Sequence, residues 1–286
     1  MSGKYRILPF LLLFKSSLRI RRKYYKCAGP NLVDPTPQRT PFLLQAGASK
    51  AGKAFAAAHA EAIFLPGMVP EKTRDVVRDV KSLMRDLGRS EGSIKFIAGI
   101  FVCVDETDEL AQKKFQDLLQ YADLEGTASL FGGWTGTDLS KFSDDEDFAF
   151  KGPPAIHGLI SSWTATVPGA ADLKWTKKRV LQELAISGAH PRAIGNPTTV
   201  ADIMQKWIDV AEVDGFNLSY ATTPGTFEDL IKYLWPELHR RGVLQTEYAG
   251  TTMRENFLQD GGGPRARKGH PATKFVGRPN NISDKA

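Results

Sequence analysis

The chain has few of the residues that cross-link small proteins or bind metals. Its 286 residues include two cysteines, Cys27 and Cys103, and five histidines. The cysteines lie far apart in different local settings, so the sequence indicates neither a disulfide framework nor a cysteine-rich metal site, and we expect no metal. A reducing compartment such as the cytoplasm fits this cysteine usage best.

The apolar stretch near the start, Ile7 to Phe14, is too short to cross a bilayer, so we expect no membrane partner. The chain carries a net charge of +6, but Lys and Arg are spread along it and gather only near the ends, at 19–26 and 265–268. This distribution predicts no nucleic-acid partner. With 42% hydrophobic residues, the chain can form one large core or two small ones.

The pattern of residues 41–67 predicts a strand, a helix and a second strand. We interpret the rest of the chain by comparison with this unit. Phe42 to Leu44 is predicted to be a buried strand, and 63–67 the second strand. Ser49 stands where the helix begins, so its hydroxyl can cap the free backbone N–H groups there or, with them, bind a phosphate. Position alone leaves both interpretations open.

The same pattern continues along the chain, with a helix from Pro70 to Gly88, a strand over 94–104 and a strand over 214–219. Further helices are predicted over four ranges: 107–121 with Leu110 inward, 175–187, 199–213 with a Thr199–Asp202 capping box, and 226–242 with Thr226 as the cap and Phe227 and Ile231 inward. Residues 123–172 break the pattern and are predicted to be an irregular insertion, which suggests a functional lid or disorder. The acidic run at 144–147 has no histidine at ligand spacing and indicates a solvated surface.

Four strands that are each followed by a helix imply a parallel sheet with right-handed crossovers. The pattern leaves two architectures open, an open α/β sheet or part of a (β/α)₈ barrel, which needs eight such units.

Three stretches carry a resemblance to a known family: QAGASKAGKAFAAAHAEAIF at 45–64, the run from 187 to 242, and TEYAGTTMRENF at 246–257. In this order they resemble the nitrilotriacetate and dibenzothiophene-sulfone monooxygenase family of luciferase-like flavin enzymes. The resemblance covers roughly residues 23–257 and corresponds to the C-terminal half of such an enzyme. It implies an α/β fold, the later half of a (β/α)₈ TIM barrel, with the insertion placed before the last strand.

The resemblance also implies a cofactor and a site. In this family the turn after the fifth barrel strand contacts the phosphate of reduced FMN, which assigns that role to Ser49 and to the amides of Ala48 and Lys50. Gln45 and Gly47 would line the floor near the flavin, although sheet packing explains them equally well. The implied activity transfers one oxygen atom from O₂ to a small organic substrate, with reduced FMN supplied by a separate flavin reductase.

Three segments follow: an unmatched leader at 1–22, a partial monooxygenase domain at 23–257 and a flexible tail at 258–286. The leader, basic and apolar without acidic residues, has the composition of a mitochondrial or signal-like presequence, but we favour a foreign start joined to a truncated enzyme. The alternative to an active monooxygenase is a catalytically silent half-barrel that binds another chain or forms a homo-oligomer through its exposed sheet.

Overall fold

The computed structural model describes residues 19–21, 24, 26–28, 36–65, 69–148, 152–166 and 172–275. Most of the predicted leader and the last part of the predicted tail lie outside these residues. At the end of the predicted leader, β1 (Arg19–Arg21) pairs antiparallel with β2 (Lys26–Ala28), which follows the leader.

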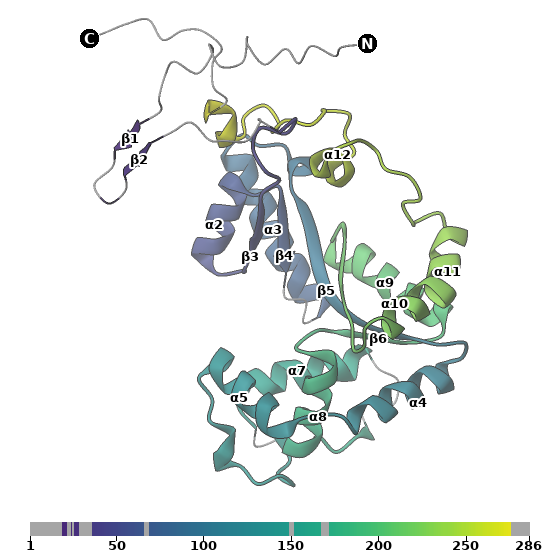
Figure 1. The fold of residues 1–286 in the computed structure, drawn as a ribbon. Helices are drawn as coiled ribbons and strands as arrows, with labels where there is room; N and C mark the ends of the chain where they lie inside the picture. Colours follow the sequence, from purple (N-terminus) through teal and green to yellow (C-terminus); the bar gives the residue numbers. More distant parts are fainter. Residues whose placement is uncertain are drawn as a thin grey trace, which may run out of the picture.

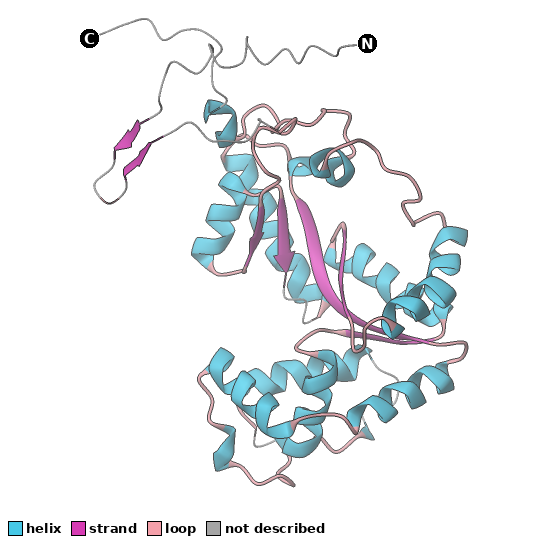
Figure 2. Ribbon diagram, in the orientation of Figure 1, coloured by secondary structure: helices cyan, strands magenta, loops and turns pink. Residues whose placement is uncertain are grey.

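A five-stranded parallel sheet is the centre of the fold (Figure 2). Its members are β3 (Leu44–Ala46), β4 (Ala62–Leu65), β5 (Lys95–Val104), β6 (Arg192–Gly195) and β7 (Gly215–Ser219). The order is β3-β4-β5-β6, and β7 also pairs with β5. The predicted α/β class with parallel strands is confirmed.

Strand β5 organises this sheet because it pairs with three others along its length. It meets β4 at Lys95–Ala98, β7 at Ile97–Phe101 and β6 at Phe101–Val104. Its sequence is almost continuously apolar, as expected of a parallel strand with side chains packed on both sides.

Helices α2 (Lys50–His59), α3 (Pro70–Asp86) and α9 (Pro197–Ala211) pack side by side against this sheet (Figure 1). The core between them joins Ala56 of α2, Val80 of α3 and Trp207 of α9 to alternate residues of β5. Helix α3 agrees with the helix predicted from Pro70 to Gly88, and its buried side chains include Val77, Val80 and Met84, whereas Leu87 is 56% exposed. Leu87 lies at the end of the helix, where the next turn needed to cover it is missing.

The prediction that residues 123–172 are irregular is wrong. The described part of this range, which follows α4 (Asp108–Leu119), is largely helical. It contains α5 (Leu124–Thr135), η2 (Leu139–Lys141) and α7 (Pro154–Thr166), and α8 (Lys177–Ser187) follows. These elements enclose a second hydrophobic core around Phe131, Phe148, Trp163 and Leu181. We call residues 124–148, 152–166 and 172–187 the helical segment. Gly132 and Gly133 lie inside α5, where packing outweighs their low helix propensity.

The last helical run divides into α10 (Gly225–Asp229), η4 (Leu230–Leu234, a π-helix) and α11 (Trp235–Arg240). Pro236 explains the wide π turn, because a proline lacks the N–H of a helix interior and its ring crowds the carbonyl one turn back. The predicted cap is wrong: the helix begins at Gly225, and Thr226 Oγ1 instead accepts a hydrogen bond from the Thr222 amide. Phe227 and Ile231, predicted to be inward, are exposed, whereas Leu230 and Leu234 are buried.

Three other predictions are corrected. The first strand lies two residues later than predicted, at Leu44–Ala46, since Phe42 packs on Phe257 of α12 (Met253–Leu258) before the strand begins. Helix α9 starts at Pro197 with Asn196 as its cap, so Thr199 heads no capping box. Leu110, predicted to be inward, is 44% exposed.

The part of the predicted tail that the structure describes packs against the fold instead of extending freely. His270 is 3% exposed and its Nε2 donates to the carbonyl of His59 at the end of α2. It precedes a short helical turn, η5 (Pro271–Phe275).

Candidate functional site

The carboxyl ends of the parallel strands lie at one edge of the sheet, where ligands bind in α/β proteins. In Figure 1, β3 and β4 point toward the side of the molecule where α5, α7 and α8 lie. The candidate site is therefore the turn after β3, on the side of the sheet that the helical segment faces.

Ser49 is the N-cap of α2, as predicted. Its Oγ accepts a hydrogen bond from the Gly52 amide at 3.0 Å, and its carbonyl accepts from Lys53 at 2.8 Å. The side chain is exposed rather than turned into the core. The hydroxyl therefore caps the helix while remaining accessible to a ligand.

Two glycines shape the turn around Ser49. Gly47 has φ +105°, a conformation that favours glycine, and it bends the chain between β3 and α2. A Cβ on Gly52 would lie 3.1 Å from Ser49 Oγ and 3.2 Å from the Gly47 carbonyl oxygen, which is tighter than ordinary contact. The space beside the helix start thus depends on the absence of a side chain at 52.

The charges at the start of α2 suit an anion. Its first turn contains no acidic residue, although acidic side chains are the ones that stabilise the positive end of a helix. Instead Lys50 and Lys53 lie there, and Lys53 pairs with Asp79 of α3. The exposed Lys50 adds positive charge to the free amides, an arrangement that a bound anion would stabilise.

Gln45 lies directly before this turn, at the middle of β3. Its Nε2 donates to the Ala46 carbonyl at 2.6 Å, while its Oε1 is buried and has no hydrogen-bond partner in the described part of the chain. An unpaired buried acceptor costs free energy unless a donor reaches it. Together with the Gly52 space and the free amides, this acceptor fits a polar ligand with an anionic group. The roles predicted for Ala48, Ser49, Lys50, Gln45 and Gly47 stay predictions.

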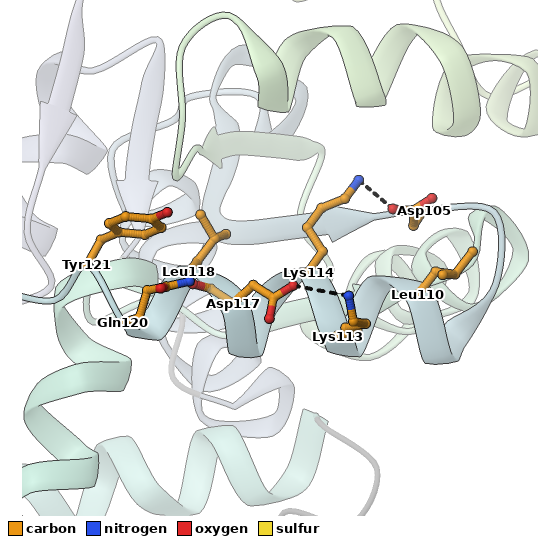
Figure 3. A pocket seen from close by; sticks show the side chains of 8 residues that line it. All are labelled: Asp105, Leu110, Lys113, Lys114, Asp117, Leu118, Gln120 and Tyr121. Atoms are coloured by element: carbon orange, nitrogen blue, oxygen red, sulfur yellow. Dashed lines mark hydrogen bonds and ion pairs between the residues drawn. The ribbon is translucent and has the colours of Figure 1, made fainter.

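A second polar cluster lies at the end of β5, beside a hollow of about 620 Å³ along α4 (Figure 3). Lys114 Nζ lies 2.6 Å from Asp105 Oδ2, 2.9 Å from Asp229 Oδ2 and 3.1 Å from the carbonyl of Val104. The cluster connects β5, α4 and α10. Since the ammonium already has two carboxylate partners, we assign the cluster to positioning these elements.

The ionisation of this cluster follows from its contacts. Burial opposes charge on Lys114, but its hydrogen bonds to Asp105 and Asp229 prevail and raise its pKa. Burial likewise opposes charge on Asp105, yet hydrogen bonds from Lys114 and the Glu106 amide lower its pKa. Burial raises the pKa of the nearby Cys103 thiol to about 12, so Cys103 is a core residue and not a nucleophile.

His190 lies at the end of the loop before β6, against Gly99 of β5. A Cβ on Gly99 would lie 2.5 Å from His190 Nδ1, so this imidazole needs a glycine beneath it. Burial lowers its pKa, which leaves the ring neutral at pH 7. The ring packs on the sheet at Gly99, which indicates a structural role for this histidine.

Sequence reasoning missed two buried ion pairs and one strand. Arg254 pairs with Glu61, and Arg192 with Glu183, and all four side chains are at most 2% exposed. No local pattern marks these pairs, because each joins residues from different elements. Strand β6 was missed because RAIG is short and begins with an arginine.

The described residues contain no cluster of three or more potential metal ligands. Within the same part of the chain, no helix is long and apolar enough to span a membrane.

A parallel sheet with helices packed against it, and with a helix start free of acidic residues at its carboxyl edge, defines an α/β protein of the kind that binds ligands at its strand ends. The family is shown by comparison: the model of the luciferase-like monooxygenases matches residues 11–210, and the chain belongs to this family. The match includes the turn at Ser49, as the sequence resemblance implied.

Several relatives agree with this assignment. The dimethyl-sulfide monooxygenase of Hyphomicrobium sulfonivorans is 39% identical over 253 residues, which are 88% of this chain and 52% of the relative. The long-chain alkane monooxygenase of Geobacillus thermodenitrificans is 36% identical and is matched over 91% of this chain and 54% of its own length. The nitrilotriacetate monooxygenase component A of Aminobacter aminovorans is 30% identical, over 82% of this chain and 52% of its own.

Solved structures support the fold. The crystal structure of DmoA from Hyphomicrobium sulfonivorans superposes with a TM-score of 0.80 at 37% identity, over 90% of this chain and 53% of that chain. A riboflavin lyase solved with modified FMN and riboflavin superposes with a TM-score of 0.71 at 28% identity, over 92% of this chain and 57% of that chain. The chain therefore spans about half the length of the relatives it matches.

Proposed function

We propose that this chain contributes the FMN phosphate site of a monooxygenase that transfers one oxygen atom from O₂ to a small organic substrate. Reduced FMN would come from a separate flavin reductase. The observation that carries the proposal is the start of α2, where Ser49, free amides and Lys50 meet at the carboxyl edge of the sheet and the first turn of the helix contains no acidic residue. Membership in a flavin-dependent family supports the identity of the anion.

Each residue has a defined task in this proposal. The Ser49 hydroxyl and the amides of Ala48 and Lys50 hold the phosphate, and the Lys50 ammonium neutralises it. Gln45 and Gly47 line the floor, where Gln45 Oε1 accepts a hydrogen bond from the ligand. When bound, FMN supplies the oxidation chemistry, and the protein holds it and excludes water.

The helical segment is the proposed lid. It lies on the side to which β3 and β4 point, and its own hydrophobic core lets it act as a unit (Figure 1). A lid of this kind encloses the substrate and limits the access of water to the reacting atoms. The relatives act on dimethyl sulfide, long-chain alkanes and nitrilotriacetate, as their names state, and the class proposed for this chain is a small organic molecule.

The test compares FMN with riboflavin, which lacks the phosphate. Ser49→Asp keeps a good N-cap but places a carboxylate where the phosphate would lie. We expect the dissociation constant for FMN to rise more than about tenfold, a loss of roughly 1.4 kcal/mol, while riboflavin binding changes little. Titration followed by flavin fluorescence measures both constants.

Thr107→Asp is the matched control, because Thr107 caps α4 in the same way and lies at another strand end. It should leave both flavins unaffected. Equal losses of FMN and riboflavin in Ser49→Asp would contradict a phosphate role for Ser49. Absence of saturable flavin binding by the parent chain would contradict an active monooxygenase.

That last outcome would favour the second candidate, a catalytically silent half-barrel that acts as a binding module. The open edges of the sheet favour this alternative, since β3 and β7 each pair on one side only among the residues that the structure describes. Its test is the state of association, because a binding module of this kind needs a partner along these edges.

A further inference from the structure

A cavity of about 320 Å³ lies at the amino edge of the sheet, at the opposite end of the strands from Ser49. Its walls come from Glu61 directly before β4, from the connection 89–93 between α3 and β5, and from residues 260–270 of the tail. In Figure 1 the yellow end of the chain crosses the end of the sheet from which β3 and β4 start. A volume of this size can hold a small ligand.

The two carboxylates that line this cavity already have cationic partners. Glu61 is 2% exposed and accepts hydrogen bonds from Arg254 at 2.6 and 2.8 Å. Asp260 accepts from Arg267 at 2.5 and 2.7 Å, and these hydrogen bonds lower its pKa. Each pair is neutral as a whole. The two carboxylates therefore leave the charge of any other cation in the cavity unbalanced.

Arg89 is a half-buried cation that has no carboxylate partner among the described residues. It donates to the carbonyls of Ala57 and Ala60 at 2.7 and 2.9 Å and to Ser93 Oγ at 3.2 Å. These contacts at the end of α2 use three of the five N–H groups of the guanidinium, so two remain for a ligand. Burial lowers the pKa of Arg89, but a guanidinium stays charged at pH 7. The contacts hold the cation at the cavity wall without neutralising it.

Two further donors line the cavity, and neither has a side-chain partner in the described part of the chain. Ser90 is the N-cap of η1 (Glu91–Ser93), yet its hydroxyl makes no capping hydrogen bond. Lys268 is exposed, and its ammonium forms no ion pair with any described residue. Ser90 lies next to Arg89 before β5, whereas Lys268 belongs to the tail. The donors therefore come from two segments that are far apart in sequence, and two of them are positively charged.

We propose that this cavity binds a doubly charged oxyanion, either inorganic phosphate or the phosphate group of a small molecule. The Arg89 guanidinium, the Ser90 hydroxyl and the Lys268 ammonium donate hydrogen bonds to its oxygens. The two unpaired cations match the charge of a phosphate group near pH 7. His270 also lines the cavity but adds no charge, because its Nδ1 accepts a hydrogen bond from the Ala272 amide. Charge-assisted hydrogen bonds of this kind are about twice as strong as neutral ones.

A phosphate bound in this way joins the tail to the body of the protein. Lys268 lies between Pro264 and His270, whose contacts already hold the tail at the amino edge of the sheet. A ligand shared by Lys268 and Arg89 adds a further attachment. The site is separate from the start of α2 at the carboxyl edge, so the proposal does not depend on flavin binding at Ser49, and the two proposals can fail separately.

The first test is titration calorimetry with inorganic phosphate. We expect saturable binding by the parent chain. Lys268→Gln keeps a long polar side chain but removes the charge, so the dissociation constant should rise about tenfold. Ser90→Ala should weaken binding by a smaller factor, because it removes a neutral donor. Arg265→Gln is the matched control: Arg265 is an exposed cation of the same tail that does not line the cavity, so the constant should not change.

The second test separates the cavity from the start of α2 and distinguishes the two sources of phosphate. Ser49→Asp changes only the turn after β3, so this variant should still bind one phosphate, and adding Lys268→Gln to it should weaken that binding. Equal constants for phosphate and glycerol 3-phosphate would identify the free ion as the ligand, whereas tighter binding of the ester would show that an organic group also contacts the cavity. Phosphate should slow hydrogen exchange in residues 264–275 of the parent chain.

A parent chain that binds no phosphate would overturn the proposal. So would binding that Lys268→Gln leaves unchanged, or that Arg265→Gln weakens equally, because the latter result would reflect net charge alone. Loss of all phosphate binding in Ser49→Asp would place the ion at the start of α2 instead. Since Lys268 is exposed, Lys268→Gln should have the same midpoint of thermal unfolding as the parent without phosphate, which shows that weaker binding does not result from unfolding.

Discussion

At the scale of single residues, Arg254 connects distant parts of the chain at the amino edge of the sheet. Its Nε and Nη2 donate to the two carboxylate oxygens of Glu61 at 2.6 and 2.8 Å. The same guanidinium also donates to the carbonyls of Thr40, Pro41 and Pro264. These hydrogen bonds hold the residues just before β3 and the residues after α12 together at the Arg254 side chain.

Arg254→Met tests this role. The substitution leaves the Glu61 carboxylate buried without its partner, and breaking a buried pair in this way costs about 3–5 kcal/mol. We expect a loss of that size in the free energy of unfolding, measured with urea. Lys113→Met, which breaks a pair whose side chains are 75% and 60% exposed, should change stability little. Equal losses in the two variants would contradict the role of Arg254.

His270 predicts a pH dependence. Its Nε2 donates to His59 and its Nδ1 accepts from the Ala272 amide at 3.1 Å, so the ring is neutral, and burial lowers its pKa. A lowered folded-state pKa gives stability that is present above the unfolded value, about 6.5, and is lost as pH falls below it. We expect the free energy of unfolding to fall from pH 7 to pH 5.5.

His270→Asn should reduce this fall, because Asn can accept from the Ala272 amide without taking up a proton. Burial also lowers the pKa of His190, so His190 should contribute a pH dependence of the same sign. A double variant in which both His270 and His190 are replaced should therefore show an even smaller loss of stability between pH 7 and pH 5.5. Urea unfolding at a series of pH values measures the slopes. An unchanged slope in the double variant would show that other groups set the pH dependence.

At the scale of elements, the sequence predicted those structural features that depend on residues close to one another in the chain. Ser49 as a cap, the strand at 94–104 and a helix within 199–213 follow from local pattern, and the structure confirms them. The pattern could not predict β6, whose partner lies about 90 residues earlier, or the helices in 123–172, which a separate core stabilises. The turn at Ser49 could be predicted from the sequence. The ion pair between Lys114 and Asp229 could be recognised only in the folded structure, because the two residues lie far apart in the chain.

The attachment of the helical segment to the sheet depends on Arg192 of β6. Its guanidinium pairs with Glu183 of α8 and lies 3.9 Å from the ring centroid of Trp163 in α7. Within the described part of the chain, its Nη2 donates to no acceptor. Burial lowers the pKa of Arg192 to about 10, against the effect of Glu183, so it stays charged at pH 7. One side chain thus joins β6, α7 and α8.

Arg192→Met should loosen this attachment. The expected loss of stability is about 1.5–3 kcal/mol, the range for a hydrogen bond to a charged group, because Arg179 still pairs with Glu183 at 2.8 Å. Hydrogen exchange should accelerate in α7 and α8 and remain slow in β4 and β5. Uniform acceleration across the sheet would instead show that the segment and the sheet unfold as one unit.

At the scale of the whole molecule, two hydrophobic cores determine the behaviour of the chain. The first core lies between the sheet and α2, α3 and α9, and the second lies inside the helical segment. Because each part has its own core, the sheet with its helices and the helical segment can open as separate units, and Arg192 is the buried side chain that joins them.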